Sequence, residues 1–160
     1  MPSMDRRRVL ASVGTVTVGS LAGCGTVGEQ SPPAGSLRFE NDHSLPHSVR
    51  CEVTGVGTTP GEGAGDVTGT ATVPAPQRDL TASTTVAPGE SQTYERVFTE
   101  PVWYGVQFTL DGERPADNAG TTRFNPAAAD GGTWELLVGH VYESGEFSWE
   151  VHATDDAGPF

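Results

Sequence analysis

The side chains of this 160-residue chain that could react or bind a metal fall into three short stretches. Cys24 stands behind a run of small and apolar residues near the N-terminus. His43 and His47 are four residues apart, and Cys51 follows at the same spacing. Residues 111–118 are rich in Asp and Glu. Thiols can be alkylated, imidazoles and thiolates bind transition metals, and carboxylates bind Ca²⁺. Each stretch therefore suggests a different chemistry.

The residues before Cys24 are predicted to form an export signal. Arg6, Arg7 and Arg8 make a basic start, and residues 9–21 are moderately hydrophobic. That second segment is too short, and too rich in Gly, Ser and Thr, to cross a bilayer of about 30 Å, so a secretory signal is the better interpretation. The small residues just before Cys24 suit cleavage by a signal peptidase.

Two motifs in this region have a family counterpart. Arg6-Arg7-Arg8-Val9-Leu10 resembles the twin-arginine export signal, and Leu21-Ala22-Gly23-Cys24 resembles the lipobox of secreted lipoproteins. The resemblance implies that Arg6 and Arg7 direct export and that residues 1–23 are a signal peptide. It also implies that Cys24 carries a thioether-linked lipid, which would anchor the protein at the outer face of the cell membrane. The alternative is a signal-anchor helix in which Cys24 is incidental.

The charge balance restricts the partners. The chain has 21 acidic residues against 9 basic ones, all of them Arg, and its formal net charge is −12. Such a surface repels phosphate backbones and anionic lipid head groups, so nucleic acid is excluded as a partner. It could attract cations or a basic partner. The many Asp and Glu residues together with the absence of Lys also resemble proteins of halophilic archaea, in which the acidic shell is a solvated surface at high salt.

Composition divides the chain after Cys24 into segments. Residues 24–35 lack apolar periodicity and contain Pro32-Pro33, which predicts a flexible lipid-anchored tether. Residues 36–152 are predicted to form one domain, and residues 153–160 a C-terminal tail. Within the domain, residues 55–77 are rich in Gly and Pro and are predicted to be a long loop.

The apolar residues of the domain recur with a period of two, which predicts strands. Turn dipeptides such as Asp111-Gly112 and Ser144-Gly145 separate the runs. No segment predicts a long amphipathic helix; residues 126–130 are the nearest, with one turn at most. Because strands with one apolar face each need a second sheet to cover it, we expect an all-β fold, an antiparallel immunoglobulin-like β-sandwich of about seven strands. The predicted strands are 37–40, 48–54, 80–86, 92–98, 102–110, 134–138 and 147–151, with a short edge strand near 70–73.

The histidine stretch has a partial family counterpart. The segment from Asn41 to Val49, with the sequence Pro46-His47-Ser48-Val49, resembles the part of small blue-copper proteins (cupredoxins) that carries the first copper ligand. The resemblance implies a metal-binding or electron-transfer protein. A blue-copper site also needs a thiolate and a second imidazole, usually with a weak Met ligand. Apart from Cys24, only Cys51 offers a thiol, and both methionines precede Cys24, so the rest of the pattern is missing.

A simpler metal site is the remaining alternative for the histidines. His43 and His47, with His140 or His152, could bind Cu(II) or Zn(II). Otherwise His43 and His47 are turn residues beside Pro46. The prediction is that no metal or other cofactor is bound.

Three further features remain. Two of them are predicted to have a structural role, and the third has two alternative roles. Cys51 is predicted to be a small buried hydrophobe without a disulfide partner. The acidic residues 111–118 fit a solvated hairpin loop better than a Ca²⁺ site, because they match no EF-hand spacing. Trp103 is either an exposed anchor for a protein or sugar, or packs under the loop 55–77.

These observations predict a lipid-anchored, non-enzymatic protein. We find no nucleophile elbow, metalloprotease helix or phosphate-binding loop, so no catalytic residue is assigned. The chain resembles the small immunoglobulin-like lipoproteins of halophilic archaea, which implies an interaction or envelope-associated module. The membrane, through the lipid on Cys24, and a cell-surface protein or glycan are the expected partners. A cupredoxin-like metal-binding or electron-transfer lipoprotein is the alternative, and an enzyme with an unrecognised site is a third.

Overall fold

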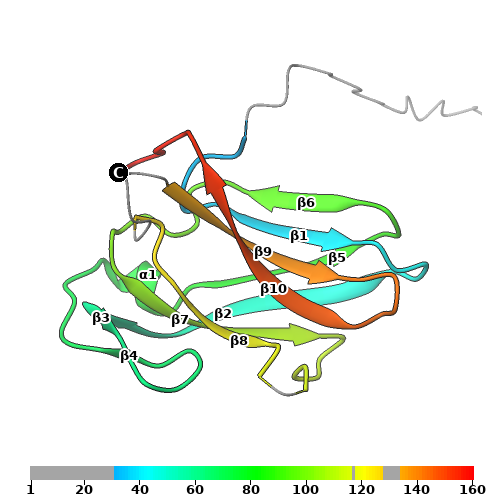
Figure 1. Cartoon of the computed structure of the whole chain (residues 1–160), viewed down its shortest axis with the longest axis horizontal. Helices are drawn as coiled ribbons and strands as arrows, with labels where there is room; N and C mark the ends of the chain where they lie inside the picture. Colours follow the sequence, from blue (N-terminus) through cyan, green and yellow to red (C-terminus); the bar gives the residue numbers. More distant parts are fainter. Residues whose placement is uncertain (1–30, 117, 128–133) are drawn as a thin grey trace, which may run out of the picture.

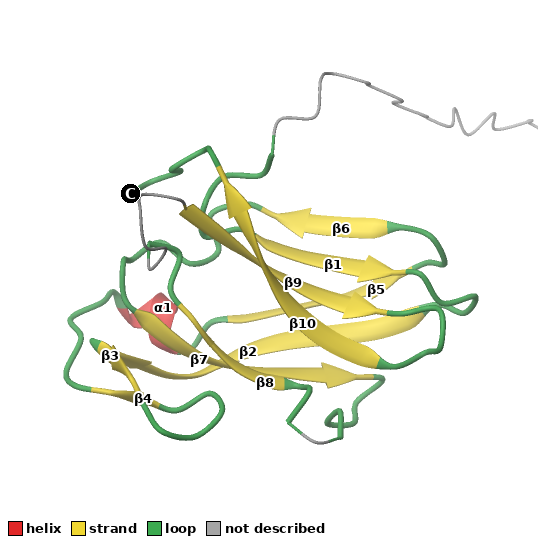
Figure 2. Ribbon diagram, viewed as in Figure 1, coloured by secondary structure: helices red, strands yellow, loops and turns green. Residues whose placement is uncertain are grey.

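The computed structural model describes residues 31–116, 118–127 and 134–160, and these form two packed four-stranded sheets (Figures 1 and 2). The predicted signal peptide, with Arg6 and Arg7, and Cys24 lie outside the described residues. In the first sheet the strand order is β10-β9-β1-β6. Its strands are β1 (Leu37–Asn41), β6 (Ser91–Tyr94), β9 (Trp134–Val141) and β10 (Phe147–Thr154).

The second sheet has the order β5-β2-β7-β8. Its strands are β2 (His47–Gly57), β5 (Thr81–Val86), β7 (Trp103–Leu110) and β8 (Thr121–Phe124). The predicted all-β sandwich is confirmed, with eight strands in the two sheets. Neighbouring strands run antiparallel except β1 and β9, which pair in parallel. The sequence analysis did not predict β8, because its four residues carry only one large apolar side chain, that of Phe124.

The core lies between the sheets and follows the predicted alternation on β1, β2 and β7. The side chain of Cys51 is fully buried, as predicted. Aromatic rings meet at the centre, where Phe39 packs edge-on against Phe108, and Phe98 against Tyr104. Area buried from water is the main source of folding free energy. The buried core residues of these three strands are Leu37, Phe39, Val49, Cys51, Val53, Tyr104, Val106 and Phe108.

On β9 both faces of the strand are buried. Leu136 and Val138, on one face, are buried, but it is Leu137 and Val141, on the other face, that belong to the core cluster. Between them, a Cβ on Gly139 would meet the rings of Phe39, Phe108 and Phe147 at 3.2 Å. Because the sequence of β9 is apolar on both faces, the alternation of residues does not show which face packs on the core. The face with Gly139 does so, because only a glycine leaves space there for the three aromatic rings.

The Gly- and Pro-rich stretch 55–77 is more ordered than predicted. It contains a small hairpin, β3 (Thr59–Pro60) with β4 (Val67–Thr68), and then the one-turn helix α1 (Ala75–Arg78). The expected edge strand at 70–73 is absent there. The hairpin lies on the outer face of β7, where a Cβ on Gly105 would overlap the carbonyl oxygen of Gly65. A glycine inside a strand is the sequence signal for such a close approach.

The sandwich has two different ends. At one end lie residues 31–36 and 155–160, which we call the terminal end. At the opposite end four connections come together, and we call it the loop end (Figure 1). The strand registers fix this arrangement, because Asn41, Val86, Leu110 and Val141 all finish their strands there. The loop end consists of residues 42–46, 87–90, 111–116, 118–120 and 142–146.

The predicted boundaries of the domain change at the terminal end. The tether was expected to reach residue 35, but Ala34 is fully buried and its N–H donates to the carbonyl of Asp156 (2.8 Å). The predicted tail is also packed: β10 runs to Thr154, and the ring of Phe160 stacks on Trp134 with centroids 5.9 Å apart. The two chain segments hold each other, because each satisfies backbone groups of the other.

Helices contribute little to the fold. In the described part of the chain, no helix is long and apolar enough to cross a membrane. The single turn expected at 126–130 falls partly outside the described residues.

Candidate functional site

The candidate site is the loop end, where a buried asparagine fixes the β1–β2 connection. Asn41 is the last residue of β1, and its side-chain Nδ2 donates to the carbonyl oxygens of Leu45 (2.8 Å) and Val86 (2.9 Å). Its Oδ1 accepts the backbone N–H of His43 at 3.0 Å. Because all three bonds are made by one buried side chain, residues 42–46 have a defined shape.

His43, His47 and Asp111 form a chain of hydrogen bonds at this end. Nδ1 of His43 lies 2.7 Å from Nε2 of His47, and Nδ1 of His47 lies 2.7 Å from Oδ2 of Asp111. The other oxygen of Asp111 accepts the backbone N–H of Ser48 at 2.8 Å. A carboxylate accepts only, so His47 donates through Nδ1, and its Nε2 accepts the hydrogen on Nδ1 of His43.

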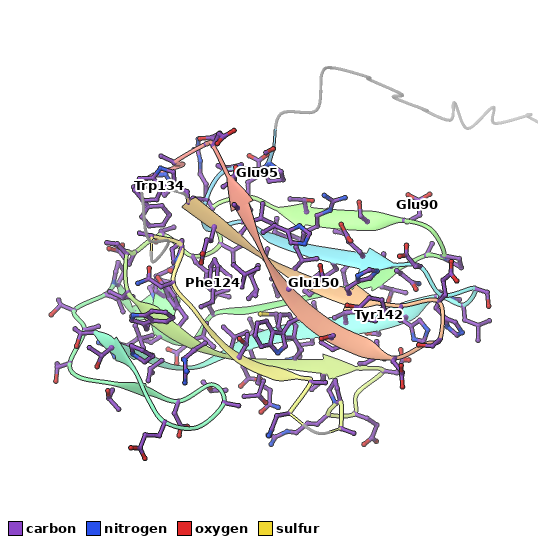
Figure 3. All side chains as sticks on the ribbon, in the orientation of Figure 1. Glu90, Glu95, Phe124, Trp134, Tyr142 and Glu150 are labelled. Carbon is purple, nitrogen blue, oxygen red and sulfur yellow. The ribbon has the colours of Figure 1, made fainter. Side chains whose placement is uncertain are left out.

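A second network begins beside the first and runs along the outer face of β9 and β10. Oδ2 of Asp42 lies 2.8 Å from Nε2 of His140, whose ring packs on that of Tyr142 at 4.2 Å. Glu150 accepts the hydroxyl hydrogen of Tyr142 (2.8 Å) and bonds Nε2 of His152 (2.8 Å). Figure 3 shows Glu150 on β10 and Tyr142 just after the end of β9. All four histidines of the chain therefore contact carboxylates or one another.

Two carboxylates of these networks, those of Asp111 and Glu150, are stabilised in their charged form. The backbone N–H of Ser48 lowers the pKa of Asp111 most, and the hydrogen bond and charge of His47 lower it further. The hydrogen bond from His152 lowers the pKa of Glu150 to about 2, with a smaller effect from Tyr142. In return, the bond to Glu150 raises the pKa of Tyr142. Donors directed at a carboxylate favour its ionised form.

An open pocket of about 530 Å³ adjoins these networks. It lies between the β7–β8 connection and the β9–β10 turn, and combines apolar side chains with carboxylates and Arg114. Leu45 and Tyr142, two of the large hydrophobic side chains that are well exposed, also belong to the loop end. The lining residues are Leu110, Glu113, Arg114, Pro115, Ala116, Ala119, Tyr142, Gly145, Glu146, Phe147 and Ser148.

The structure brings some of the predicted metal ligands together and separates others. His43 and His47 are paired, whereas His140 and His152 belong to the second network. Cys51 is four strand positions from His47, about 13 Å along β2, and its side chain faces the core. Burial raises the pKa of its thiol, with a contribution from the charge of Glu52. The described residues therefore do not assemble a blue-copper ligand set.

The described residues hold no larger ligand cluster. Within the described ranges, no group of three or more His, Cys, Asp or Glu side chains is arranged to hold a metal ion. In the acidic stretch 111–118, the carboxylate of Asp111 is directed at His47 and Ser48, while Asp117 lies outside the described residues.

Trp103 packs against the hairpin of the 55–77 stretch. It is half-buried and lines a pocket of about 320 Å³ with Glu62, Ala64 and Gly65. The residue is thus neither fully exposed nor covered by the hairpin.

The sequence analysis missed the partners of the histidines. Asp111 is 64 residues from His47, and Glu150 was not singled out. The Asp-Gly turn at 111–112 was the available signal, since an Asp that ends one strand can contact the start of its neighbour. It could not be used without the β2–β7 register, which places Leu110 opposite Val49.

Comparison with known proteins gives no relative for this site. No known protein family, no curated protein and no solved structure matches the chain. The lipoprotein, immunoglobulin-like and cupredoxin-like resemblances therefore stay predictions.

Proposed function

We propose that this protein is an exported, lipid-anchored and non-enzymatic binding module at the outer face of the cell membrane, and that the loop end is its binding surface. The observation that carries the proposal is the opposition of the two ends. Ser31, the first described residue, lies at the terminal end, so an anchor at Cys24 would attach there. The loop end would then face away from the membrane.

The character of the loop end supports a binding role. Connections between strands tolerate sequence change and are held by a rigid scaffold, so they commonly carry binding residues. Here the loops combine a 530 Å³ pocket with the exposed side chains of Leu45 and Tyr142. Exposed apolar side chains beside a pocket are typical of interaction sites.

Charge points to a basic protein partner. The described residues of the loop end carry six carboxylates and a single basic side chain, Arg114. Arginine or lysine side chains of a partner could pair with these carboxylates, while its apolar side chains contact Leu45 and Tyr142. The carboxylates of the loop end are Asp42, Glu90, Asp111, Glu113, Glu143 and Glu146.

The anchor is tested by mass spectrometry of the protein from a membrane fraction of a halophilic archaeal host. We expect loss of residues 1–23 and a mass increase on Cys24 equal to a lipid. The matched variant Cys24→Ser should leave the membrane fraction, and Arg6→Lys with Arg7→Lys should stay unprocessed. An unmodified N-terminus at Met1 would refute the anchor.

The binding surface is tested by photo-crosslinking in intact cells. A crosslinking residue at position 45, in the loop end, should capture one reproducible protein. The same residue at position 95, exposed at the terminal end, should not. Charge reversal at Glu143 and Glu146 should reduce that capture by about 10-fold, and reversal at Glu95 should not. Equal products from both positions would refute the proposed surface.

A further inference from the structure

The hydrogen-bonded pair His43–His47 has the arrangement of a small metal site. Their two facing nitrogens, Nδ1 and Nε2, are 2.7 Å apart and share one hydrogen. Two imidazoles bound to one metal ion at about 2.0–2.1 Å have nitrogens about 2.9–3.3 Å apart, depending on the coordination angle. A separation larger by a few tenths of an ångström would therefore let a divalent ion replace the shared hydrogen.

The residue behind His47 fits the same role. In protein metal sites, a ligating histidine commonly donates its other N–H to a carboxylate, which fixes the ring and strengthens the ligand. Asp111 does this for His47 at 2.7 Å. Asp111 is itself held by the backbone N–H of Ser48, so the carboxylate has a fixed position. The lone pair of Nε2 therefore points toward His43.

His43 is positioned from two sides. The bond from its backbone N–H to Asn41 sets the start of the loop. Its ring lies against Gly145, where a Cβ would be 3.4–3.6 Å from three ring atoms. Gly145 has a φ of 82°, a backbone conformation that favours glycine. The β9–β10 turn thus lies beside the nitrogen-bearing edge of the His43 ring.

We propose that His43 and His47 form a two-histidine site for a divalent transition-metal ion, with Asp111 as the residue that positions His47. This site is independent of the anchor and of the protein partner proposed above. Neutral imidazoles favour Cu²⁺, Ni²⁺ and Zn²⁺ over Ca²⁺ or Mg²⁺, and Cu²⁺ binds nitrogen sites most tightly among these ions. Water would complete the coordination.

The test is titration of the purified full chain with Cu²⁺, followed by electron paramagnetic resonance and by tryptophan fluorescence. We expect one ion per chain at micromolar concentration, with hyperfine coupling to two nitrogens. His43→Ala or His47→Ala should abolish the saturable binding. His152→Ala, a histidine on β10 that contacts Glu150, is the matched control and should bind as the original chain does.

A substitution of Asp111 tests whether this residue positions His47 for metal binding. Asp111→Asn keeps the size of the side chain but weakens its bond to His47, and should reduce Cu²⁺ affinity by about 10-fold or more. Unfolding curves without metal check that each variant is folded. Equal binding in the His47→Ala and His152→Ala variants, coupling to a single nitrogen, or no saturable binding would refute the site. A failure of the crosslinking experiment alone would leave the site supported.

Discussion

The terminal end and the loop end use polar side chains in opposite ways. Beside the terminal end, where the N–H of Phe98 donates to Gly35, buried Gln77 is held by neutral groups. Its Nε2 donates to the carbonyl of Val97, and its Oε1 accepts from Tyr104 and from the N–H of Thr99. At the loop end, the hydrogen bonds join histidines to carboxylates that are themselves exposed. Neutral buried bonds resist change in pH and salt, whereas exposed charged ones respond to both. The bonds of Gln77 are therefore expected to be insensitive to pH and salt, whereas those of the loop end are expected to respond to both.

The largest effect is expected from the aromatic core beside the terminal end. Phe98 is fully buried and packs edge-on against Tyr104 and Phe124, with centroids 5.0 Å away in each case. Phe98→Ala should lower the free energy of unfolding by about 4 kcal/mol in denaturant titration, because it leaves a cavity. Leu45→Ala, at an exposed position of the loop end, should change it by less than about 0.5 kcal/mol. Similar losses of unfolding free energy in both variants would contradict the proposed difference between the aromatic core and the loop end.

The buried glutamine should rank second. Gln77→Ala removes the partner of the Tyr104 hydroxyl, of the Thr99 N–H and of the Val97 carbonyl. Leaving buried polar groups without partners costs about 2 kcal/mol or more of unfolding free energy. Burial raises the pKa of Tyr104 to about 12, which agrees with a dry environment for its hydroxyl. Gln92→Ala, whose side chain is exposed on β6, is the control and should be close to neutral.

The sandwich could be predicted from the sequence because its cause is local. The side chains of a strand alternate, so the residues of β1, β2 and β7 report their buried face directly. On β9 the rule fails, since Leu136, Leu137 and Val138 are consecutive and all buried. Its core face depends on rings from other strands that fit only beside Gly139.

The candidate site was predictable only in part. The pair His43 and His47 stood out because it is close in sequence. Asp111 and Glu150 join histidines through strand pairing, and pairing register is a property of the whole sheet rather than of a segment. The packing of the terminal end could not be predicted for the same reason. Pro32 and Ala34 belong to no apolar pattern, and their hydrogen-bond partners, Thr154 and Asp156, are more than 100 positions away.

The C-terminal aromatic tests whether the tail belongs to the terminal end. The ring of Phe160 stacks on Trp134 with an angle of 17° between the planes. Phe160→Ala should lower the unfolding free energy by about 1 kcal/mol and change the fluorescence of Trp134. Phe160→Tyr keeps the ring and should leave both unchanged. An alanine variant with full stability would show that the tail is not part of the packed end.

The smallest effect should come from the acid response of the second histidine–carboxylate network. Glu150 has a folded-state pKa of about 2, below its ordinary value of 4.5, because His152 and Tyr142 donate to it. A lowered pKa contributes stability that is present above about pH 4.5 and is lost as the pH falls toward 2. Since the side chain is 37% exposed, solvent screening limits the contribution to less than about 1 kcal/mol.

Glu150→Gln should therefore flatten the fall of unfolding free energy between pH 4.5 and 2, and have its largest cost near neutral pH. Glu143→Gln, at a neighbouring exposed carboxylate of the β9–β10 turn, should keep the original slope. The readout is a set of denaturant titrations at constant salt across this pH range. If the two variants had the same acid slope, the second network would not couple protonation to folding.

Because Gln77 and its partners carry no charge near pH 7, the Gln77→Ala variant should retain the original acid slope while losing more stability at every pH. The Gln77→Ala variant should thus show a large loss of unfolding free energy that does not depend on pH, and the Glu150→Gln variant a small loss that does. Neutral buried hydrogen bonds and exposed charged ones would then differ in their response to acid as well as in their position in the fold.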